Sequence, residues 1–429
     1  MRNLIVRSTA VIEGVCEPPP DKSISHRALI CNSLFPGEAT VQNLLQSEDV
    51  FSTMGVLRSL GVSIEGASGT YRVQSQGLQE AHDVLDCGNS GTTMRLMSGV
   101  LSAQPFFSIL KGDASLSSRP MGRIILPLRK QGVLIQGRKE DSCAPLAIRG
   151  FKGDAFSYQL PIPSAQVASS LMLYGLLSNG CTISKMGRAR DHTERMFRSM
   201  GAQIHTEDDS VTLFPSPLQN IDICVPGDPS SAAFFIVAAL ICGSELSITG
   251  VGVNPTRFAF VETLRMMGAD IEISQIREQG GEPIADLCVK KSTLRGIVLD
   301  EESIPAQVDE IPLLAVAAVF AAGETIVYGA QELRVKESDR IHAICSNLKK
   351  MGARIQELPD GFRVCGTGEL AGAEVDSFGD HRIAMACAIA GLQAKGATTV
   401  HNSSCITISF PHFVKVLNGL GANIEEVST

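Results

Sequence analysis

LGVSI, residues 60–64, is the first of six closely similar stretches that decide how this chain folds. In each stretch a glycine separates an upstream helical pattern from a downstream alternating pattern. A glycine in this place indicates a helix C-terminus that leads into a β-strand. The other five stretches are QGVLI from Gln131, MGAQI from Met200, MGADI from Met267, MGARI from Met351 and LGANI from Leu420.

The spacing of these glycines predicts an internal repeat. Successive glycines lie 71, 69, 67, 84 and 69 residues apart, so the repeated unit is about 70 residues long. Each unit also contains an earlier helix that is apolar on nearly all sides after a polar first turn, which predicts burial. We therefore expect a strand, a buried helix, further strands, a second helix and a last strand after the glycine. The buried helices are expected to start at Asp21, Gly88, Pro163, Gly227, Asp309 and Gly379.

The repeats predict two α/β domains of three units each. A chain of 429 residues is too long for one hydrophobic core. The division is expected near Val225 and Pro226, where the fourth unit begins, so the first domain spans residues 18–225. The second domain is expected to hold residues 226–429 together with the strand in residues 1–17, which makes it discontinuous.

Composition narrows the class of protein. The net charge of −8 argues against a nucleic-acid-binding surface over the whole protein. Twelve cysteines are scattered without a C-x-x-C pair, which is typical of a reducing compartment. The N-terminus lacks the apolar stretch of a signal peptide, and no apolar run has the length of a membrane span. We therefore expect a cytoplasmic protein whose partners are neither nucleic acid nor membrane.

The polar helix starts predict binding sites for small anions. A helix N-terminus offers free N–H groups and partial positive charge. Cations accompany several starts: Lys22, Arg27, Arg95 and Arg382. Arginine matches carboxylates and phosphates with two parallel hydrogen bonds, so the pattern favours a small, heavily anionic ligand. Two further cationic clusters are GDASLSSRPMGR (112–123), with Arg119 and Arg123, and ELRVKESDR (332–340), where Lys336 and Arg340 share a face if the segment is helical.

Two carboxylates beside these cations are candidates for acid–base chemistry. Asp309 and Glu337 are suited to act as base and acid. The alternative is that Asp309 only caps a helix and that Glu337 only pairs with Lys336. The fragment DHTER (191–195) is interpreted as structural rather than metal-binding. The chain has no phosphate-binding G-x-x-x-x-G-K-[ST] loop and no convincing dinucleotide fingerprint, so we expect neither a cofactor nor a metal.

Eight motifs follow one another along nearly the whole chain: DKSISHRA, GNSGTTMRL, GDASLSSRPMGR, PSAQVASSL, RDHTERM, PGDPSSAAF, ELRVKESDR and GDHRIAM. Taken together and in this order they resemble those of the 5-enolpyruvylshikimate-3-phosphate synthases. The resemblance implies two similar domains, each of three βαβαββ units with buried parallel helices, an inside-out α/β barrel. It also implies transfer of the enolpyruvyl group of phosphoenolpyruvate to shikimate 3-phosphate by a monomeric enzyme.

Site residues follow from the same resemblance. Asp309, Glu337 and Lys22 resemble the catalytic residues of the family. The first domain resembles the domain that binds shikimate 3-phosphate. The residues that resemble ligands of shikimate 3-phosphate are Lys22, Ser23, Arg27, Ser164, Ala165, Gln166, Arg190, Asp309 and Lys336. Those that resemble ligands of phosphoenolpyruvate are Lys22, Asn89, Gly91, Arg119, Gln166, Arg340 and Arg382.

The sequence departs from the family's pattern at two places, and two other functions remain open. Many members carry a lysine where this chain has Ile408, and a lysine often follows the valine that here is Val167. One alternative is the UDP-N-acetylglucosamine enolpyruvyl transferase, which typically has a cysteine in the loop that corresponds to residues 112–121; this loop has none. The other is a non-catalytic anion-binding protein, which would gain nothing from carboxylates beside its arginines.

Overall fold

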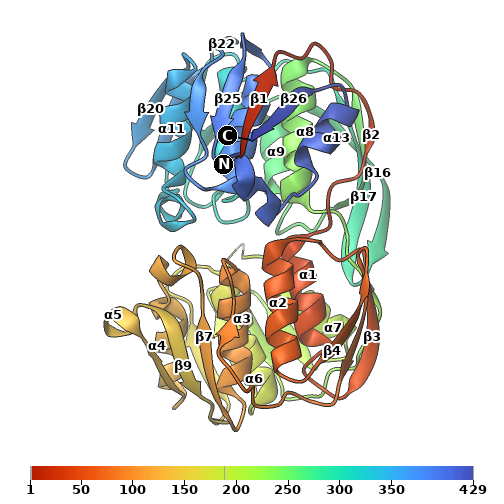
Figure 1. Cartoon of the computed structure of the whole chain (residues 1–429), viewed down its shortest axis with the longest axis vertical. Helices are drawn as coiled ribbons and strands as arrows, with labels where there is room; N and C mark the ends of the chain where they lie inside the picture. The colour runs from red at the N-terminus through yellow and green to blue at the C-terminus, as the bar shows by residue number, and fades with distance from the viewer. Residues whose placement is uncertain (1, 188, 429) are drawn as a thin grey trace. The chain divides into compact units, whose positions relative to one another are not determined.

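The computed structural model describes residues 2–187 and 189–428, and its chain divides into two compact units. The N-terminal unit holds Pro20–Pro226 and the short segment Glu278–Glu282. The C-terminal unit holds Met1–Pro19, Gly227–Arg277 and Pro283–Thr429. Figure 1 shows the elements of both units. No helix in the described ranges has both the length and the apolar character needed to cross a membrane.

Three four-stranded sheets of one topology form the strands of the N-terminal unit in its described part. In each sheet the first two strands are parallel, and the remaining neighbours are antiparallel. The sheets run β14 (Ile223–Cys224), β3 (Gly37–Gln42), β5 (Thr70–Ser75) and β4 (Ser63–Ala67); β6 (Leu85–Asp86), β7 (Phe107–Lys111), β9 (Cys143–Arg149) and β8 (Leu134–Gly137); β10 (Phe156–Gln159), β11 (Cys181–Ser184), β13 (Ser210–Leu213) and β12 (Ile204–Glu207).

The remaining sheets repeat this order. β1 (Arg2–Arg7) lies between two strands of the last sheet (Figure 1), with Leu4 opposite both Val400 and Glu426. These sheets run β2 (Gly14–Cys16), β15 (Leu246–Gly252), β17 (Glu282–Lys290) and β16 (Asp270–Gln279); β18 (Val298–Leu299), β19 (Glu324–Val327), β21 (Gly361–Cys365) and β20 (Arg354–Leu358); β23 (Glu374–Asp376), β25 (Thr398–His401), β1 and β26 (Asn423–Ser428), with β22 (Leu370–Ala371) and β24 (Ala394–Lys395) as an extra pair.

The predicted buried helices are confirmed. Each starts within three residues of its expected position, and side chains on all faces are buried. Asp21, Ser90, Asp228 and Asp380 cap four of them by accepting a backbone N–H, which is why the first turns carry small polar residues. The helices are α1 (Lys22–Cys31), α3 (Gly91–Ser102), α6 (Ala165–Leu177), α8 (Pro229–Cys242), α10 (Ile311–Val319) and α12 (His381–Gly391).

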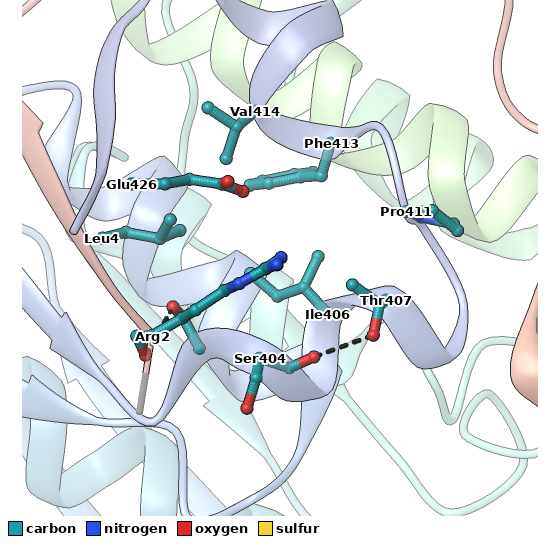
Figure 2. Close-up of a pocket in the computed structure, with 10 residues that line it drawn as sticks. Arg2, Leu4, Ser404, Ile406, Thr407, Pro411, Phe413, Val414 and Glu426 are labelled. Carbon is teal, nitrogen blue, oxygen red and sulfur yellow. Dashed lines mark hydrogen bonds between the residues drawn. The ribbon is translucent and has the colours of Figure 1, made fainter. Parts of the chain in front are cut away.

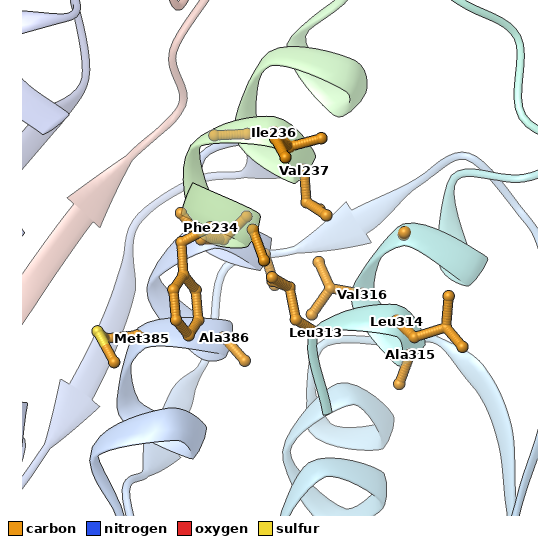
Figure 3. Close-up of a cluster of buried hydrophobic side chains, with 14 of the residues drawn as sticks. Phe234, Ile236, Val237, Leu313, Leu314, Ala315, Val316, Met385 and Ala386 are labelled. Carbon is orange, nitrogen blue, oxygen red and sulfur yellow. The ribbon is translucent and has the colours of Figure 1, made fainter. Parts of the chain in front are cut away.

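These helices form the centre of each hydrophobic core. In the N-terminal unit α3 packs against α6, and in the C-terminal unit α8, α10 and α12 pack against one another. Figure 3 shows Phe234 of α8 beside Met385 of α12, with Leu313 of α10 in the same cluster. Because the helix bodies are apolar on every side, their polar groups are confined to the ends. The helix N-termini are therefore the places where charged ligands can meet this fold.

The second helix of each unit ends as the repeat predicts. Each is followed by a glycine in the left-handed region, with φ between +84° and +105°, and then by a strand. Side chains rarely adopt this backbone conformation, which explains why glycine recurs there. The helices are α2 (Glu48–Ser59), α4 (Gly122–Lys130), α7 (His192–Ser199), α9 (Ala259–Met266), α11 (Arg340–Lys350) and α13 (Phe413–Gly419), and the glycines are Gly61, Gly132, Gly201, Gly268, Gly352 and Gly421.

One long hairpin contributes to the longest spacing between glycines, the 84 residues from Gly268 to Gly352. Its strands β16 and β17 have 10 and 9 residues, against 5 and 6 for β4 and β5 in the first unit. The tip of this hairpin, Glu278–Glu282, groups with the N-terminal unit. The sequence pattern did not predict that this segment would group with the N-terminal unit.

The glycine requirement can be tested at Gly352, where φ is +87° and a methyl group would meet nothing within 4 Å. Gly352→Ala should lower the free energy of unfolding by about 1–2 kcal/mol, because only the backbone conformation opposes the side chain. The matched control is Gly55→Ala inside α2, where space is equally open and φ is helical. That change should raise the free energy by about 0.5–1 kcal/mol. Equal effects in urea unfolding would contradict the explanation.

Candidate active site

The first turns of α1 carry two cations in different settings. Lys22 Nζ lies 3.1 Å from Asp49 Oδ2, and its side chain keeps 20% exposure. Arg27 is buried and donates to the hydroxyls of Thr193 and Ser169, each at 2.7 Å. It also donates to the carbonyl of Ser23 at 3.0 Å, which links these two predicted ligands. Arg27 is held rigidly, whereas Lys22 is partly open to an incoming anion.

Several predicted ligands converge at the start of α3. Arg119 Nη2 donates to Asn89 Oδ1 at 2.6 Å, and Arg95 Nη1 donates to Gln166 Oε1 at 2.6 Å. A methyl group on Gly91 would lie 2.9 Å from Arg95 Nη1 and 3.4 Å from Arg119 Nη1. Two guanidinium groups therefore approach the backbone of Gly91. This is the arrangement that a compact anion at a helix N-terminus requires.

The start of α6 places the next predicted ligands in a row. Ser164 is the N-cap residue, Ala165 is the first helical residue, and both are half-buried. Gln166 follows and donates to Thr92 Oγ1 at 3.3 Å, which ties α6 to α3. Arg190, just before α7, is half-buried and close enough to Arg27 to oppose its charge.

Arg340 is the centre of the charged cluster in the C-terminal unit. It is 1% exposed, and its guanidinium meets three carboxylates. The distances are 2.7 Å from Nε to Asp380 Oδ2, 3.1 Å from Nη1 to Asp309 Oδ1 and 2.6 Å from Nη2 to Glu337 Oε2. Burial lowers the pKa of Arg340. The charges of Asp380, Glu337 and Asp309 together raise this pKa by more than burial lowers it, so the net shift is upward. Arg340 is therefore permanently charged.

Arg382 shares one of these carboxylates. Its Nη1 donates to the backbone carbonyl of Asp309 at 3.3 Å, and its Nη2 lies 3.7 Å from Asp309 Oδ2. Its Nη1 also lies 3.8 Å from Glu310 Oε1. The structure thus brings Asp309, Glu337, Arg340 and Arg382 into one cluster at the starts of α10, α11 and α12.

Lys336 is placed differently from the helical hypothesis. Asp339 caps α11 by accepting from the N–H of His342, so the helix starts at Arg340. Lys336 ends a short 3-10 helix, η2 (Gln331–Val335), with a non-helical ψ of −148°. The segment from Lys336 to Arg340 is therefore not helical, and the condition for a shared helix face is not met. Lys336 Nζ instead lies 3.1 Å from Glu332 Oε1.

The structure bears on the two alternatives for the carboxylates, in which Asp309 is a helix cap and Glu337 pairs with Lys336. The N-cap residue of α10 is Glu310, not Asp309, and Asp309 faces Arg340 and Arg382. Glu337 pairs with Arg340 rather than with Lys336. Neither carboxylate has the role that its structural alternative assigned, and both lie on guanidinium groups.

Sequence reasoning missed the partners of these cations. Asp380 was visible only as a polar residue before a helix, but its side chain is fully buried and accepts from Arg340 across 40 residues of chain. Asp49 was not singled out, although it pairs with Lys22. Both lie in the first turn or at the cap of a helix, so the signal was an acidic residue at a helix start beside a cationic motif.

The fragment DHTER forms part of a buried polar layer. His192 Nδ1 lies 2.7 Å from Glu282 Oε1, and both are almost fully buried. Glu194 is buried as well, and burial raises its pKa to about 7, with Asp191 adding to the shift and Arg27 and His192 opposing it. No group of three His, Cys, Asp or Glu side chains able to hold a metal ion is found within residues 2–187 and 189–428.

A separate small pocket lies in the C-terminal unit. It is lined by residues of β1, β26, α13 and the 3-10 helix η3 (Ser403–Ile408). Figure 2 shows Arg2, Phe413 and Thr407 around it, with the Thr407 hydroxyl donating to the carbonyl of Ser404 at 2.9 Å. Its described lining includes none of the predicted ligands. The helix starts, not this pocket, remain the candidate site.

The fold and the two clusters define a class of protein: an α/β protein that presents arginine and carboxylate groups at helix N-termini, as an enzyme acting on small anions does. The family model for EPSP synthase (3-phosphoshikimate 1-carboxyvinyltransferase) matches residues 6–417. The chain belongs to this family.

Individual relatives agree. The chain is similar to a 3-phosphoshikimate 1-carboxyvinyltransferase of Desulforudis audaxviator, 50% identical over 416 residues, covering 95% of this chain and 97% of the relative. It is 46% identical over 424 residues to that of Geobacter sulfurreducens, covering 97% and 99%. A solved structure of EPSP synthase from Acinetobacter baumannii is 41% identical, with a TM-score of 0.89 and full coverage of both chains. The enolpyruvyl transferase NikO from Streptomyces tendae, 16% identical with a TM-score of 0.80, covering 100% of this chain and 99% of that one, shares the fold alone.

The buried carboxyl of Glu194 predicts a dependence of stability on pH. In the folded protein it keeps its proton up to a pKa of about 7, whereas the ordinary value is 4.5. The folded state therefore binds more protons between these values, and stability is lost as the pH rises through them. Glu194→Gln, which cannot ionise, should gain on the order of 3 kcal/mol over the native protein between about pH 4.5 and pH 8. Urea unfolding across this range measures the difference.

The control is the exposed Glu207→Gln in β12, whose stability difference from the native protein should not change with pH. A difference for Glu194→Gln that stays constant from about pH 4.5 to pH 8 would show that the carboxyl is ionised in the folded state.

Proposed function

We propose that this chain transfers the enolpyruvyl group of phosphoenolpyruvate to the 5-hydroxyl of shikimate 3-phosphate and releases phosphate. This is the 3-phosphoshikimate 1-carboxyvinyltransferase step of chorismate and aromatic amino-acid biosynthesis. The observation that carries the proposal is the cluster of Asp309, Glu337, Arg340 and Arg382 in a chain of this family. It joins two arginines that suit an anion with two carboxylates that suit proton transfer.

Phosphoenolpyruvate carries a phosphate and a carboxylate, so it needs several cations. We assign to it Lys22, Asn89, Gly91, Arg119, Gln166, Arg340 and Arg382. The approach of Arg95 and Arg119 to Gly91 supports this assignment, since a side chain at Gly91 would occupy the space between backbone and cations. The fixed guanidinium of Arg340 supports it as well, because a preorganised charge needs no rearrangement during the reaction.

We assign to shikimate 3-phosphate Lys22, Ser23, Arg27, Ser164, Ala165, Gln166, Arg190, Asp309 and Lys336. The start of α6 suits the 3-phosphate, because Ser164 is the N-cap residue and the first backbone N–H groups of the helix have no intrahelical acceptor. Ser23 and Arg27 suit the carboxylate and ring hydroxyl side. Arg27 donates to the backbone carbonyl of Ser23, which supports a joint role.

The proposed addition has two proton transfers. The 5-hydroxyl oxygen adds to C2 of phosphoenolpyruvate while Asp309 takes the hydroxyl proton and Glu337 gives a proton to the methylene carbon. A tetrahedral intermediate results. In the elimination Glu337 takes a proton back from the new methyl group, and the phosphate departs with the proton held by Asp309, which restores the double bond in the product and the starting state of both carboxyl groups. Lys22 is placed with the catalytic groups because its partly open ammonium can follow the charge on the phosphate.

Two alternatives are weaker. The UDP-N-acetylglucosamine enolpyruvyl transferase is disfavoured because residues 112–121 contain no cysteine. A non-catalytic anion binder is disfavoured because it would gain nothing from Asp309 and Glu337 beside its arginines. Ile408, which ends η3, is apolar where many members of the family carry a lysine, so it is not assigned to phosphoenolpyruvate.

The finer organisation stays a proposal. We propose that residues 18–225 and residues 1–17 with 226–429 form two similar domains, each an inside-out α/β barrel with its parallel helices at the centre. The shared sheet order and the buried helices support this. We further propose a monomer in the cytoplasm that uses no cofactor.

The function is tested by phosphate release from the purified protein. Phosphate should appear only when phosphoenolpyruvate and shikimate 3-phosphate are both present. Release from phosphoenolpyruvate alone, or with UDP-N-acetylglucosamine as the acceptor, would overturn the assignment.

The two carboxylates can be tested by amide substitution. Asp309→Asn and Glu337→Gln should each lower kcat by about a hundredfold or more, because each removes one proton transfer. The KM values should change much less, since the amides keep the side-chain shape. The matched control is Asp300→Asn, an exposed carboxylate that accepts from Ser303 and lies outside the cluster. Near-normal kcat in either test variant would return that residue to a structural role.

Gly91 can be tested with the inhibitor glyphosate, which the family resemblance suggests occupies the phosphoenolpyruvate pocket and which is longer than the substrate. Gly91→Ala would press on the Arg95 and Arg119 guanidinium groups, at a cost of roughly 1–3 kcal/mol for the ligand that needs them in place. The inhibition constant for glyphosate should rise by a larger factor than the KM for phosphoenolpyruvate.

The control is Gly122→Ala, the first residue of α4, where a methyl group would meet nothing within 4 Å. Equal factors for inhibitor and substrate in Gly91→Ala would show that Gly91 does not discriminate ligand length.

A further inference from the structure

A chain of buried polar side chains crosses the N-terminal unit, and the proposed reaction does not use it. It starts at His26 in α1, passes through Thr53 in α2 and Thr93 in α3, and ends at Ser90, the N-cap of α3. All four residues are 0% exposed. A buried hydrogen-bonded chain of this length is costly to leave incomplete, so its presence in an apolar core calls for a reason.

The distances along the chain are short and continuous. His26 Nδ1 lies 2.7 Å from Thr53 Oγ1, and Thr53 Oγ1 lies 2.7 Å from Thr93 Oγ1. Thr93 Oγ1 donates to Ser90 Oγ at 2.6 Å, and the Thr93 backbone N–H donates to the same Ser90 oxygen at 3.1 Å. Three helices are thereby joined at the point where α3 begins.

The direction of the hydrogen bonds fixes the state of His26. Because Thr93 gives its one hydroxyl proton to Ser90, its oxygen must accept from Thr53. Thr53 in turn must accept from His26, so the proton of the imidazole lies on Nδ1. His26 Nε2 is buried and has no hydrogen-bond partner among the described residues. A second proton on Nε2 would therefore have no acceptor.

The charges around His26 agree with a neutral ring. Burial, followed by the positive charges of Lys22 and Arg27, lowers the pKa of His26 well below its usual 6.5, and Asp21 opposes this only in part. A neutral imidazole with a fixed tautomer is a permanent donor to Thr53. Its Nδ1–H can therefore hold Thr53 by a hydrogen bond.

The chain ends at the part of α3 that carries the proposed phosphoenolpyruvate ligands. Ser90 is flanked by Asn89, which accepts from Arg119, and by Gly91, the first residue of the helix. Thr93 Oγ1 also lies 3.5 Å from the carbonyl of Asp49, the residue that pairs with Lys22. A shift of Ser90 would therefore move the Gly91 N–H relative to Arg119 and Lys22.

We propose that His26 is a positioning residue for phosphoenolpyruvate, which acts through Thr53 and Thr93 to hold Ser90 and the Gly91 N–H in place. The inference rests on the proposed function, because it takes Gly91 as a ligand of phosphoenolpyruvate. His26 itself touches neither substrate in this account. Its neighbour Arg27, which is assigned to shikimate 3-phosphate, donates instead to the hydroxyls of Thr193 and Ser169.

Two amide variants of His26 distinguish positioning from simple filling of space. In His26→Asn an amide N–H can stand where Nδ1 stands, because both are bonded to Cγ. In His26→Gln the amide lies one bond farther out, so the bond to Thr53 is lost while a polar side chain of similar length remains. The third variant, Thr53→Val, keeps the side-chain shape and breaks the same chain at the next link.

The experiment is steady-state kinetics of phosphate release by the full chain. We expect His26→Gln and Thr53→Val to raise the KM for phosphoenolpyruvate about tenfold, with kcat and the KM for shikimate 3-phosphate changed less than about twofold. The double variant should be no worse than either single variant, because both break one chain. His26→Asn should restore nearly native values.

Three results would overturn the proposal: an unchanged KM for phosphoenolpyruvate in His26→Gln and Thr53→Val, equal losses for both substrates, or additive losses in the double variant. A native protein that releases no phosphate with both substrates would instead overturn the proposed function. In that case, or if a variant does not fold, nitrogen NMR of the native protein decides the inference. It should show His26 protonated on Nδ1 only; an Nε2 proton would overturn it.

Discussion

Burial of the Arg340 guanidinium is the constraint on which the C-terminal unit depends. An isolated charge in a protein interior costs far more than a domain's net stability, so it must be fully paired. Asp380, Asp309 and Glu337 supply that pairing from three helix starts. Removing any of these carboxylates leaves charge uncompensated. A buried ion cluster adds little to the net free energy of folding. It does fix the positions of its side chains, because any arrangement that leaves the guanidinium unpaired is costly.

The repeated unit explains why such clusters form where they do. Helices with apolar sides on every face can be buried only if their polar groups are concentrated at their ends. In the C-terminal unit the ends carry arginines and carboxylates, and in the N-terminal unit they carry cations with hydroxyl and amide partners. One architecture thus supplies two kinds of polar surface: one with acid and base groups, and one made mainly of hydrogen-bond donors.

Much of the fold followed from local signals in the sequence. The glycines after the second helices were recognisable because a positive φ restricts the residue type, and the buried helices because apolar residues occupy all their faces. The pairing of β1 with β25 and β26 and the exchange of Glu278–Glu282 were not visible in the same way. They depend on contacts between distant segments, which no local pattern records.

The site followed the same division. Cations at helix starts could be predicted from motifs, but their partners could not. Asp380 and Arg340 lie 40 residues apart, and His26, Thr53 and Thr93 lie on three different helices. The four-residue spacing of Lys336 and Arg340 would have placed them on one helix face, but Asp339 caps α11, which begins only at Arg340. The sequence motifs indicate which residue types lie in the site, whereas the fold determines which side chains pair with one another.

The central claim is that Asp309 and Glu337, joined through Arg340, act as one catalytic device. The most direct test compares kcat of the double variant Asp309→Asn with Glu337→Gln against kcat of each single variant. If the two carboxylates work as a unit, the double variant should be about as slow as the slower single variant. A loss equal to the product of the two single losses would show that they contribute independently and would contradict the account.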